Sequence, residues 1–193
     1  MDGEQSIAVL EALIADKGED LLRTAILLAG SRAEGEDLLQ AALERVFKRW
    51  RWIRGDPEGY LRRTLHHLAI DGWRAKQTWR ARLRLLAAPE AAPDMADAVD
   101  QRDRVVRLLR QLPPRQRAAV VLRYWEDLTE AETAKAMNCS VGAVKSAASR
   151  GLSKLRELSA AAGLSPPMGP APAGHPDGAN RLGKNMRTAG RTA

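Results

Sequence analysis

Apolar residues recur three and four positions apart through most of this chain, the spacing that places side chains on one face of an α-helix. In the first half, the pattern predicts helices over Ile7–Asp16, Asp20–Ala29, Ala33–Trp50 and Glu58–Trp79. No stretch shows the alternation of apolar and polar residues that marks a half-buried strand. The pattern therefore predicts an all-α protein.

Short helix-breaking sequences separate these predicted helices. Gly30-Ser31 ends the second helix. In Gly55-Asp56-Pro57 the aspartate suits an N-cap and the proline suits the first helical position. The apolar positions that we expect to be buried are Ile7, Leu10, Ile14, Leu21, Ile26, Leu28, Leu39, Ala42, Val46, Trp50, Leu61, Leu65 and Leu68.

A second helical unit begins near Arg102. The preceding residues 85–101 hold two prolines, many alanines and several acids without apolar periodicity, so we interpret them as a flexible acidic linker. Pro113-Pro114 divides two further helices, the second over Arg115–Trp125. Residues 161–193 are rich in glycine and proline, which predicts a disordered tail. The predicted organisation is an N-terminal arm (1–18), two small helical domains (19–84 and 102–160) and the linker and tail.

The stretch Leu128–Arg156 has the spacing of a helix-turn-helix. Thr129 and Glu132 form a capping-box pattern, which predicts a helix over Glu130–Met137. A tight turn follows, and Ser140 suits the N-cap of a second helix from Val141. Such a second helix commonly enters a major groove, although an ordinary helical hairpin with a solvated basic face has the same spacing.

The second helix of this motif has two chemically different faces. Its apolar face contains Val144, Ala148, Leu152 and Leu155. Its other face contains mostly small, polar and basic residues, namely Gly142, Lys145, Ser146, Ser149 and Ser153. No acid occurs from Val141 to Arg156, whereas four residues there are basic, so this face suits an anionic partner.

Composition narrows the class of protein. The 193 residues include 31 Lys and Arg against 24 Asp and Glu, which gives a net charge of +7 and favours a polyanionic partner. The single cysteine, Cys139, excludes an internal disulfide and fits a reducing compartment. The chain shows neither a signal peptide nor an apolar run of about eighteen residues. We therefore expect a soluble cytoplasmic protein without membrane insertion.

Two sets of short motifs, in order along the chain, resemble those of one protein family. Glu36-Asp37-Leu38-Leu39-Gln40 and Pro57-Glu58-Gly59-Tyr60-Leu61-Arg62-Arg63 resemble region two of bacterial sigma factors of the extracytoplasmic-function (ECF) group. Leu112-Pro113-Pro114-Arg115-Gln116-Arg117, Leu122-Arg123-Tyr124 and residues 140–146 resemble region four. Leu27-Leu28-Ala29-Gly30-Ser31 and residues 69–74 are similar to the sigma-E-type subgroup. Together these motifs cover about residues 19–158.

The resemblance implies a sigma factor, which directs promoter-specific transcription and is not itself an enzyme. It implies core RNA polymerase and promoter DNA as partners, leaves an anti-sigma factor open as a third, and requires no cofactor or metal. By this resemblance, Asp37, Leu38 and Gln40 dock the clamp helices of the polymerase. The alternative for these residues is a solvated acidic helix face.

The resemblance also implies two DNA-binding surfaces. In the family, the helix that begins here at Pro57 captures the minus-ten element as a single strand, which requires cations for the backbone and flat side chains for the bases. The residues that meet this requirement are Arg62, Arg63, His66, His67, Trp73 and Arg74. Trp73 is equally open to a packing role against Leu38 or Trp50. The residues implied to read the minus-thirty-five duplex are Ser140, Gly142, Lys145, Ser146, Ser149 and Arg150.

Three positions depart from the family pattern. His67 stands where asparagine is usual, and an imidazole does not read a base edge as an amide does. Thr133 replaces isoleucine and puts a hydroxyl at a packing position, while Ala143 replaces threonine and removes a phosphate contact. These departures indicate a divergent reader of DNA with the same fold.

Two other functions remain open. A dimeric operator-binding regulator also uses a helix-turn-helix, but it needs a ligand or phosphoacceptor domain that residues 20–79 do not provide. A metal-dependent enzyme would build on His67 and Asp71, which lie four apart on one predicted helix, but no further histidine or cysteine ligand lies close in sequence except adjacent His66.

Overall fold

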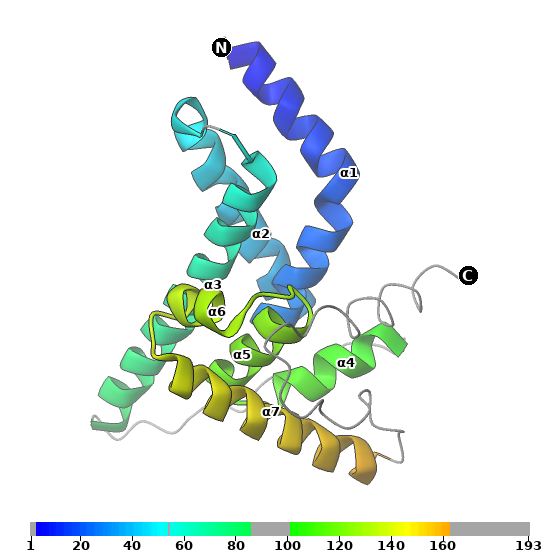
Figure 1. Ribbon diagram of the computed structural model, residues 1–193, viewed down its shortest axis with the longest axis vertical. Helices are drawn as coiled ribbons and strands as arrows, with labels where there is room; N and C mark the ends of the chain where they lie inside the picture. The colour runs from blue at the N-terminus through cyan, green and yellow to red at the C-terminus, as the bar shows by residue number, and fades with distance from the viewer. Residues whose placement is uncertain (1–2, 54, 86–100, 163–193) are drawn as a thin grey trace.

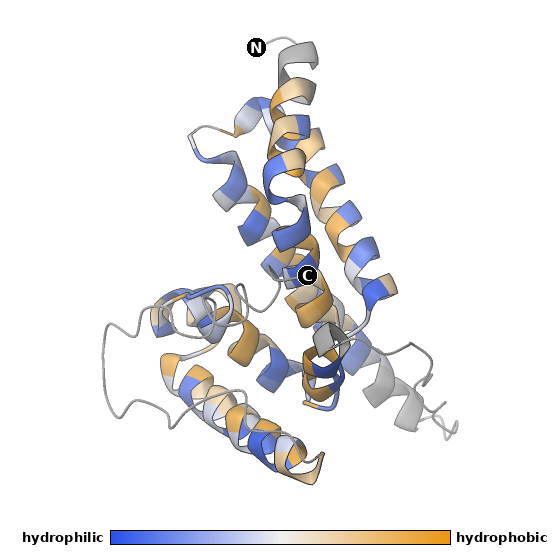
Figure 2. Ribbon diagram, turned by 90° about the vertical axis from the view of Figure 1, so that its right-hand side faces the viewer, coloured by the Kyte–Doolittle hydropathy of each residue, from blue (hydrophilic) through white to orange (hydrophobic). Residues whose placement is uncertain are grey.

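The prediction of an all-α protein is confirmed. The computed structural model describes residues 3–53, 55–85 and 101–162, and within them every regular element is a helix. The elements are α1 (Gly3–Ala29), α2 (Arg32–Arg49), the short 3₁₀-helix η1 (Trp50–Trp52), α3 (Pro57–Leu85), α4 (Gln101–Arg110), α5 (Pro114–Tyr124), α6 (Glu130–Ala136) and α7 (Val141–Ala161). Nearly all of the predicted linker and tail lie outside the described residues. Figure 2 shows hydrophobic and hydrophilic residues interspersed along the helices, as expected of amphipathic elements.

The expected break between two short N-terminal helices is wrong, because α1 runs without interruption from Gly3 to Ala29. An isolated glycine such as Gly18 costs a helix only about 1 kcal/mol relative to alanine. Leu10 and Leu21, on either side of it, are buried in one hydrophobic cluster, and that burial offsets the cost. Ile14 was expected in the core but is 40% exposed.

The first three helices form an N-terminal unit with its own hydrophobic cluster. Leu61 and Leu65 of α3 are fully buried there, as is Val46 of α2. Trp50, in η1, closes the cluster at 5% exposure. The predicted stripes on α2 and α3 therefore face the core as expected.

Helices α4 to α7 form a C-terminal unit whose hydrophobic cluster extends onto the N-terminal unit. Leu122 of α5 and Val144 of α7 are fully buried in it. Leu27 and Leu28 of α1 and Ile70 of α3 belong to the same cluster. Figure 1 shows α5 and α6 lying between α7 and the helices of the N-terminal unit. The two units therefore share a core in this arrangement.

Helices α1 and α2 pack at very close range. The chain turns between them at Gly30, whose φ of 97° is a conformation that residues with a side chain rarely adopt. Five residues later, a Cβ on Gly35 would lie 2.7 Å from the Cα of Ile26 in α1. The approach of the two backbones therefore depends on the missing side chain at Gly35.

This close approach predicts opposite effects for two Gly→Ala substitutions. Gly35→Ala should destabilise the fold by roughly 1–3 kcal/mol, because α1 and α2 must move apart. Gly72→Ala should instead stabilise by roughly 0.5–1 kcal/mol, because Gly72 is exposed within α3 and a Cβ there meets no atom within 4 Å. Thermal unfolding followed by circular dichroism measures both. Equal effects of the two substitutions would contradict the packing described here.

Candidate nucleic-acid interface

The helix-turn-helix forms as its local sequence predicts. Thr129 Oγ1 accepts a hydrogen bond from the backbone N–H of Glu132 at 3.2 Å, and the Glu132 carboxylate accepts one from the N–H of Thr129 at 2.8 Å. This capping box starts α6. The turn passes through Asn138 with a φ of 43°, a conformation that asparagine tolerates well. Ser140 Oγ then accepts from the N–H of Ala143 at 3.2 Å and starts α7.

Helix α7 divides into a buried and an exposed face. Its buried face includes Val144, Ala148, Leu152 and Leu155, each at most 6% exposed. The predicted duplex-contacting residues that are exposed are Ser140, Gly142, Lys145, Ser146, Ser149 and Arg150. Their location is the predicted one, and their role in DNA binding stays a prediction.

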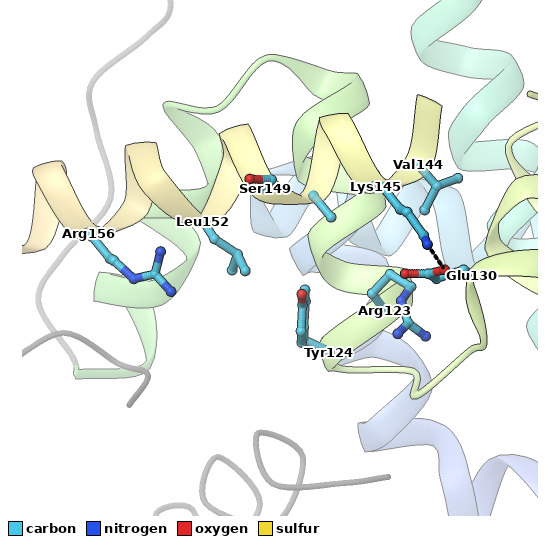
Figure 3. A pocket seen from close by; sticks show the side chains of 9 residues that line it. Arg123, Tyr124, Glu130, Val144, Lys145, Ser149, Leu152 and Arg156 are labelled. Atoms are coloured by element: carbon cyan, nitrogen blue, oxygen red, sulfur yellow. Dashed lines mark ion pairs between the residues drawn. The ribbon is translucent and has the colours of Figure 1, made fainter. Parts of the chain in front are cut away.

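A shallow groove runs along α7 and adds cations to this surface. It is lined by Arg123 and Tyr124 of α5 and by Lys145, Ser149 and Arg156 of α7, among others. In Figure 3 the ammonium group of Lys145 points toward the carboxylate of Glu130, 3.3 Å away. Arg123 and Arg156 were missed from the sequence as groove residues.

The signal for Arg156 was present in the sequence. Arg156 follows Lys145 by eleven residues, about three helical turns, and so lies on the same face of α7. Arg123 belongs to α5 and had no comparable local signal, since only the tertiary packing of α5 on α7 brings it to the groove.

The six predicted strand-binding residues of α3 have different environments. Arg63 and His67 are exposed as expected. The expectation that His66 lies on the surface is wrong for this arrangement, because its side chain is only 4% exposed. The side chain of Arg62 is 22% exposed. The side chains of Arg62 and His66 both contact Glu126 of the C-terminal unit.

Trp73 and Arg74 also contact the C-terminal unit. Trp73 is half-buried and packs against the shared hydrophobic cluster, whose buried members include neither Leu38 nor Trp50, so its role stays a prediction. The Arg74 guanidinium lies 5.9 Å from the centre of the Trp73 ring. It donates hydrogen bonds to the backbone carbonyls of Met137 and Asn138 at 2.8 and 3.3 Å. These carbonyls lie where α6 ends, so the Arg74 cation satisfies the acceptors of a helix terminus.

Glu126, just after α5, is the centre of a buried polar cluster that we call the Glu126 contact. Its side chain is 3% exposed. One oxygen accepts from Thr24 Oγ1 at 2.7 Å, the other lies 3.1 Å from His66 Nε2, and an N–H group of Arg62 lies 3.1 Å from both. Trp125 Nε1 donates to Thr24 Oγ1 at 2.9 Å. Sequence reasoning missed this cluster, whose members come from α1, α3 and the end of α5.

The cluster keeps the Glu126 carboxylate ionised. Burial alone would raise the pKa of Glu126. The hydrogen bond from His66, the charges of His66 and Arg62 and the hydroxyl of Thr24 outweigh burial and lower this pKa from 4.5 to about 2. An ionised carboxylate only accepts hydrogen bonds, so His66 Nε2 carries the hydrogen in this pair.

The residues implied to dock the polymerase differ in exposure. Asp37 and Gln40 of α2 are exposed, and Gln40 donates to Glu44 at 3.4 Å. Leu38 was expected to be exposed beside them. It is half-buried instead and packs against both hydrophobic clusters, because it faces inward between the units. Of the three residues implied to dock the polymerase, only Asp37 and Gln40 are therefore exposed on α2.

Two of the remaining sequence features concern metals and membranes. Within the described ranges, no group of three or more His, Cys, Asp or Glu residues is arranged to hold a metal ion, and His67 and Asp71 do not form part of one. No helix in the described part of the chain is both long and apolar enough to cross a membrane.

Thr133, which departs from the family pattern, is fully buried, as its packing position predicted. Its hydroxyl has no hydrogen-bond partner among the described residues.

Comparison with known proteins places this geometry in a family. Residues 13–80 match the family described as Sigma-70 region 2, and residues 102–155 match Sigma-70, region 4. The RNA polymerase sigma-E factor of Streptomyces coelicolor is 37% identical over 152 residues, which cover 76% of this chain and 84% of that protein. The ECF RNA polymerase sigma factor SigE of Mycolicibacterium smegmatis is 32% identical over 159 residues, covering 76% of this chain and 60% of that protein.

A solved structure has a related fold. It contains the sigma factor RpoE in complex with the anti-sigma factor NepR from Bartonella quintana, with a TM-score of 0.50 and 22% identity. The match covers 80% of this chain and 94% of that one. The chain described here belongs to the sigma-70 family, within the ECF group of RNA polymerase sigma factors.

The low pKa of Glu126 predicts a defined pH dependence. Because this pKa is about 2 in the folded chain and 4.5 by default, the stabilisation is complete above pH 4.5 and is lost as the pH falls toward 2. This contribution to the free energy of unfolding is about 3 kcal/mol. Urea unfolding of wild type and Glu126→Gln should therefore give free energies of unfolding that differ most above pH 4.5 and converge in acid. A difference that does not change below pH 4.5 would contradict the assignment.

Proposed function

We propose that this chain binds core RNA polymerase and directs it to promoters, with α3 holding the melted minus-ten strand and α7 reading the minus-thirty-five duplex. The observation that carries the proposal is the exposed face of α7, which combines helix-turn-helix geometry with cations and small polar side chains. Membership of the sigma-70 family supports the same function for both units. The polymerase carries out the chemistry, so this chain acts in the cytoplasm as an initiation factor and not as an enzyme.

The α7 surface suits a duplex for chemical reasons. Gly142 and Ser146 leave room for the helix to approach base edges, and a Cβ on Gly142 would meet no atom within 4 Å. Lys145 and Arg150 supply positive charge for phosphates. Arg123 and Arg156 extend this charge along the groove beside α7. Phosphate contacts position the helix, and the short side chains between them approach the bases.

The α3 surface suits a single strand. Arg63 and His67 are exposed and offer a charge and a flat ring. Arg62, His66 and Arg74 would join them once they leave their partners in the C-terminal unit. Because Trp73 packs against the shared cluster, a stacking role for it requires the same separation.

Two protein partners complete the proposal. Asp37 and Gln40 on the exposed side of α2 would meet the polymerase clamp helices, with Leu38 contributing from the edge of this surface. An anti-sigma factor is a further partner to test, since the related fold from Bartonella quintana is bound to one. Neither partner requires a bound cofactor or metal.

A reconstituted transcription assay tests the function. Wild-type protein should give start-site-specific transcripts from genomic promoter fragments with core polymerase, and Asp37→Arg should abolish both these transcripts and binding to core. Asp16→Arg is the matched control, because Asp16 is an exposed acid on α1 that is outside the proposed docking surface. Retention of core binding by Asp37→Arg would place the docking surface elsewhere. A dimeric operator binder would instead bind DNA as a dimer and would not associate with core.

The assignment of α7 to duplex predicts a specific salt effect. Lys145→Ala should weaken binding to minus-thirty-five duplex and reduce the salt dependence of the binding constant by about one counterion. Lys154→Ala is the control, since Lys154 lies on the same helix, nine residues on and about half a turn round, and pairs with Glu157. Fluorescence anisotropy over a range of salt concentrations measures both. An equal loss in the two variants would indicate nonspecific attraction.

A further inference from the structure

The C-terminal unit covers most of the strand-binding surface that α3 is proposed to offer. Arg62 and His66 are bonded to Glu126, and Arg74 is bonded to two backbone carbonyls at the end of α6. Trp73 packs into the shared cluster. A melted strand cannot use these four side chains while the two units remain together.

The Glu126 carboxylate presents the same chemistry as the phosphate that it would exclude. Arginine and protonated imidazole bind carboxylate and phosphate oxygens alike through charge-assisted hydrogen bonds. In the Glu126 contact one N–H group of Arg62 lies 3.1 Å from each carboxylate oxygen, and His66 Nε2 lies 3.1 Å from one of them. The acid is therefore bonded to side chains that would otherwise meet the DNA backbone.

The interface between the two units contains buried charged groups. It buries the charges of Arg62 and Glu126, and it also buries much of Arg117, whose guanidinium lies over Gly30. Burial lowers the pKa of Arg117, and its Nε has no hydrogen-bond partner in the described part of the chain. Desolvation of charged groups offsets much of the attraction between them, so such an interface is less stable than an apolar one of equal area.

We propose that Glu126 holds the chain in a closed, autoinhibited form by taking the place of a strand phosphate on α3. This inference rests on the strand-binding role proposed for α3. Strand binding then requires the C-terminal unit to leave α3, and the apparent affinity for the strand is reduced by the fraction of molecules that are open. Binding of the polymerase to both units would stabilise the open form.

The inference is tested with full-length protein and a fluorescein-labelled oligothymidine strand. Glu126→Gln should raise strand affinity by about tenfold, because it increases the open fraction, and should increase the radius of gyration measured by small-angle X-ray scattering. Thr24→Val should change both quantities in the same direction. It removes the hydroxyl that donates to Glu126 and accepts from Trp125 without changing the charge, so electrostatics alone cannot explain its effect.

Glu58→Gln is the matched control. Glu58 also pairs with Arg62, at 3.0 Å, but it belongs to α3 itself, so the variant removes one negative charge beside Arg62 and leaves the contact between units intact. It should leave the radius of gyration unchanged and strand affinity within about twofold, since an i,i+4 ion pair within one helix contributes little.

The possible outcomes separate the two proposals. Equal gains in strand affinity for Glu58→Gln and Glu126→Gln would overturn autoinhibition, as would expansion of Thr24→Val without any gain in affinity. If Glu126→Gln fails to fold, as judged by circular dichroism, Thr24→Val decides the question. Another outcome is that the wild-type protein supports promoter-specific transcription while neither variant gains strand affinity. That result would leave the proposed function in place and refute the closed form. Absence of transcription with core polymerase would refute the function instead.

Discussion

A buried ionised carboxylate requires partners, and in this protein those partners come from two other helices. Glu126 is 3% exposed, and leaving its charge unpaired in that position would cost several kcal/mol. Thr24 of α1 and Arg62 and His66 of α3 meet the requirement. These bonds, together with the shared hydrophobic cluster, hold α5 against the N-terminal unit. Once α5 is placed, its packing against α7 determines where the helix-turn-helix lies.

The helices and the helix-turn-helix were predictable because their determinants are local. The capping box of Thr129 and Glu132, the turn at Asn138 and the N-cap at Ser140 lie within twelve residues of one another and form the expected hydrogen bonds. The two faces of α7 follow from the same short-range periodicity. The break expected between Asp16 and Asp20 is absent, because α1 continues through Gly18.

What could not be predicted depends on contacts between distant residues. The burial of His66 reflects an acid sixty positions away, and the inward position of Leu38 reflects the second unit packing against α2 and α3. A basic, aromatic helix face has the same composition whether it meets DNA or an internal carboxylate. Arg123 shows the same limit, because only the packing of α5 against α7 brings it beside Lys145. The basic and aromatic character of each helix face could therefore be predicted from the sequence, but the residues that pack against that face could not.

The exposed face of α7 and the buried Glu126 contact respond differently to ionic strength. Lys145 on α7 is 61% exposed, so dissolved ions screen its charge within a Debye length of about 8 Å at physiological salt. The ion pairs of Glu126 lie out of reach of most of these ions and are screened far less. Added salt therefore weakens charge interactions at the outer face of α7 more than those of the Glu126 contact. Under the proposals made above, ionic strength would shift the balance between DNA binding and the closed form.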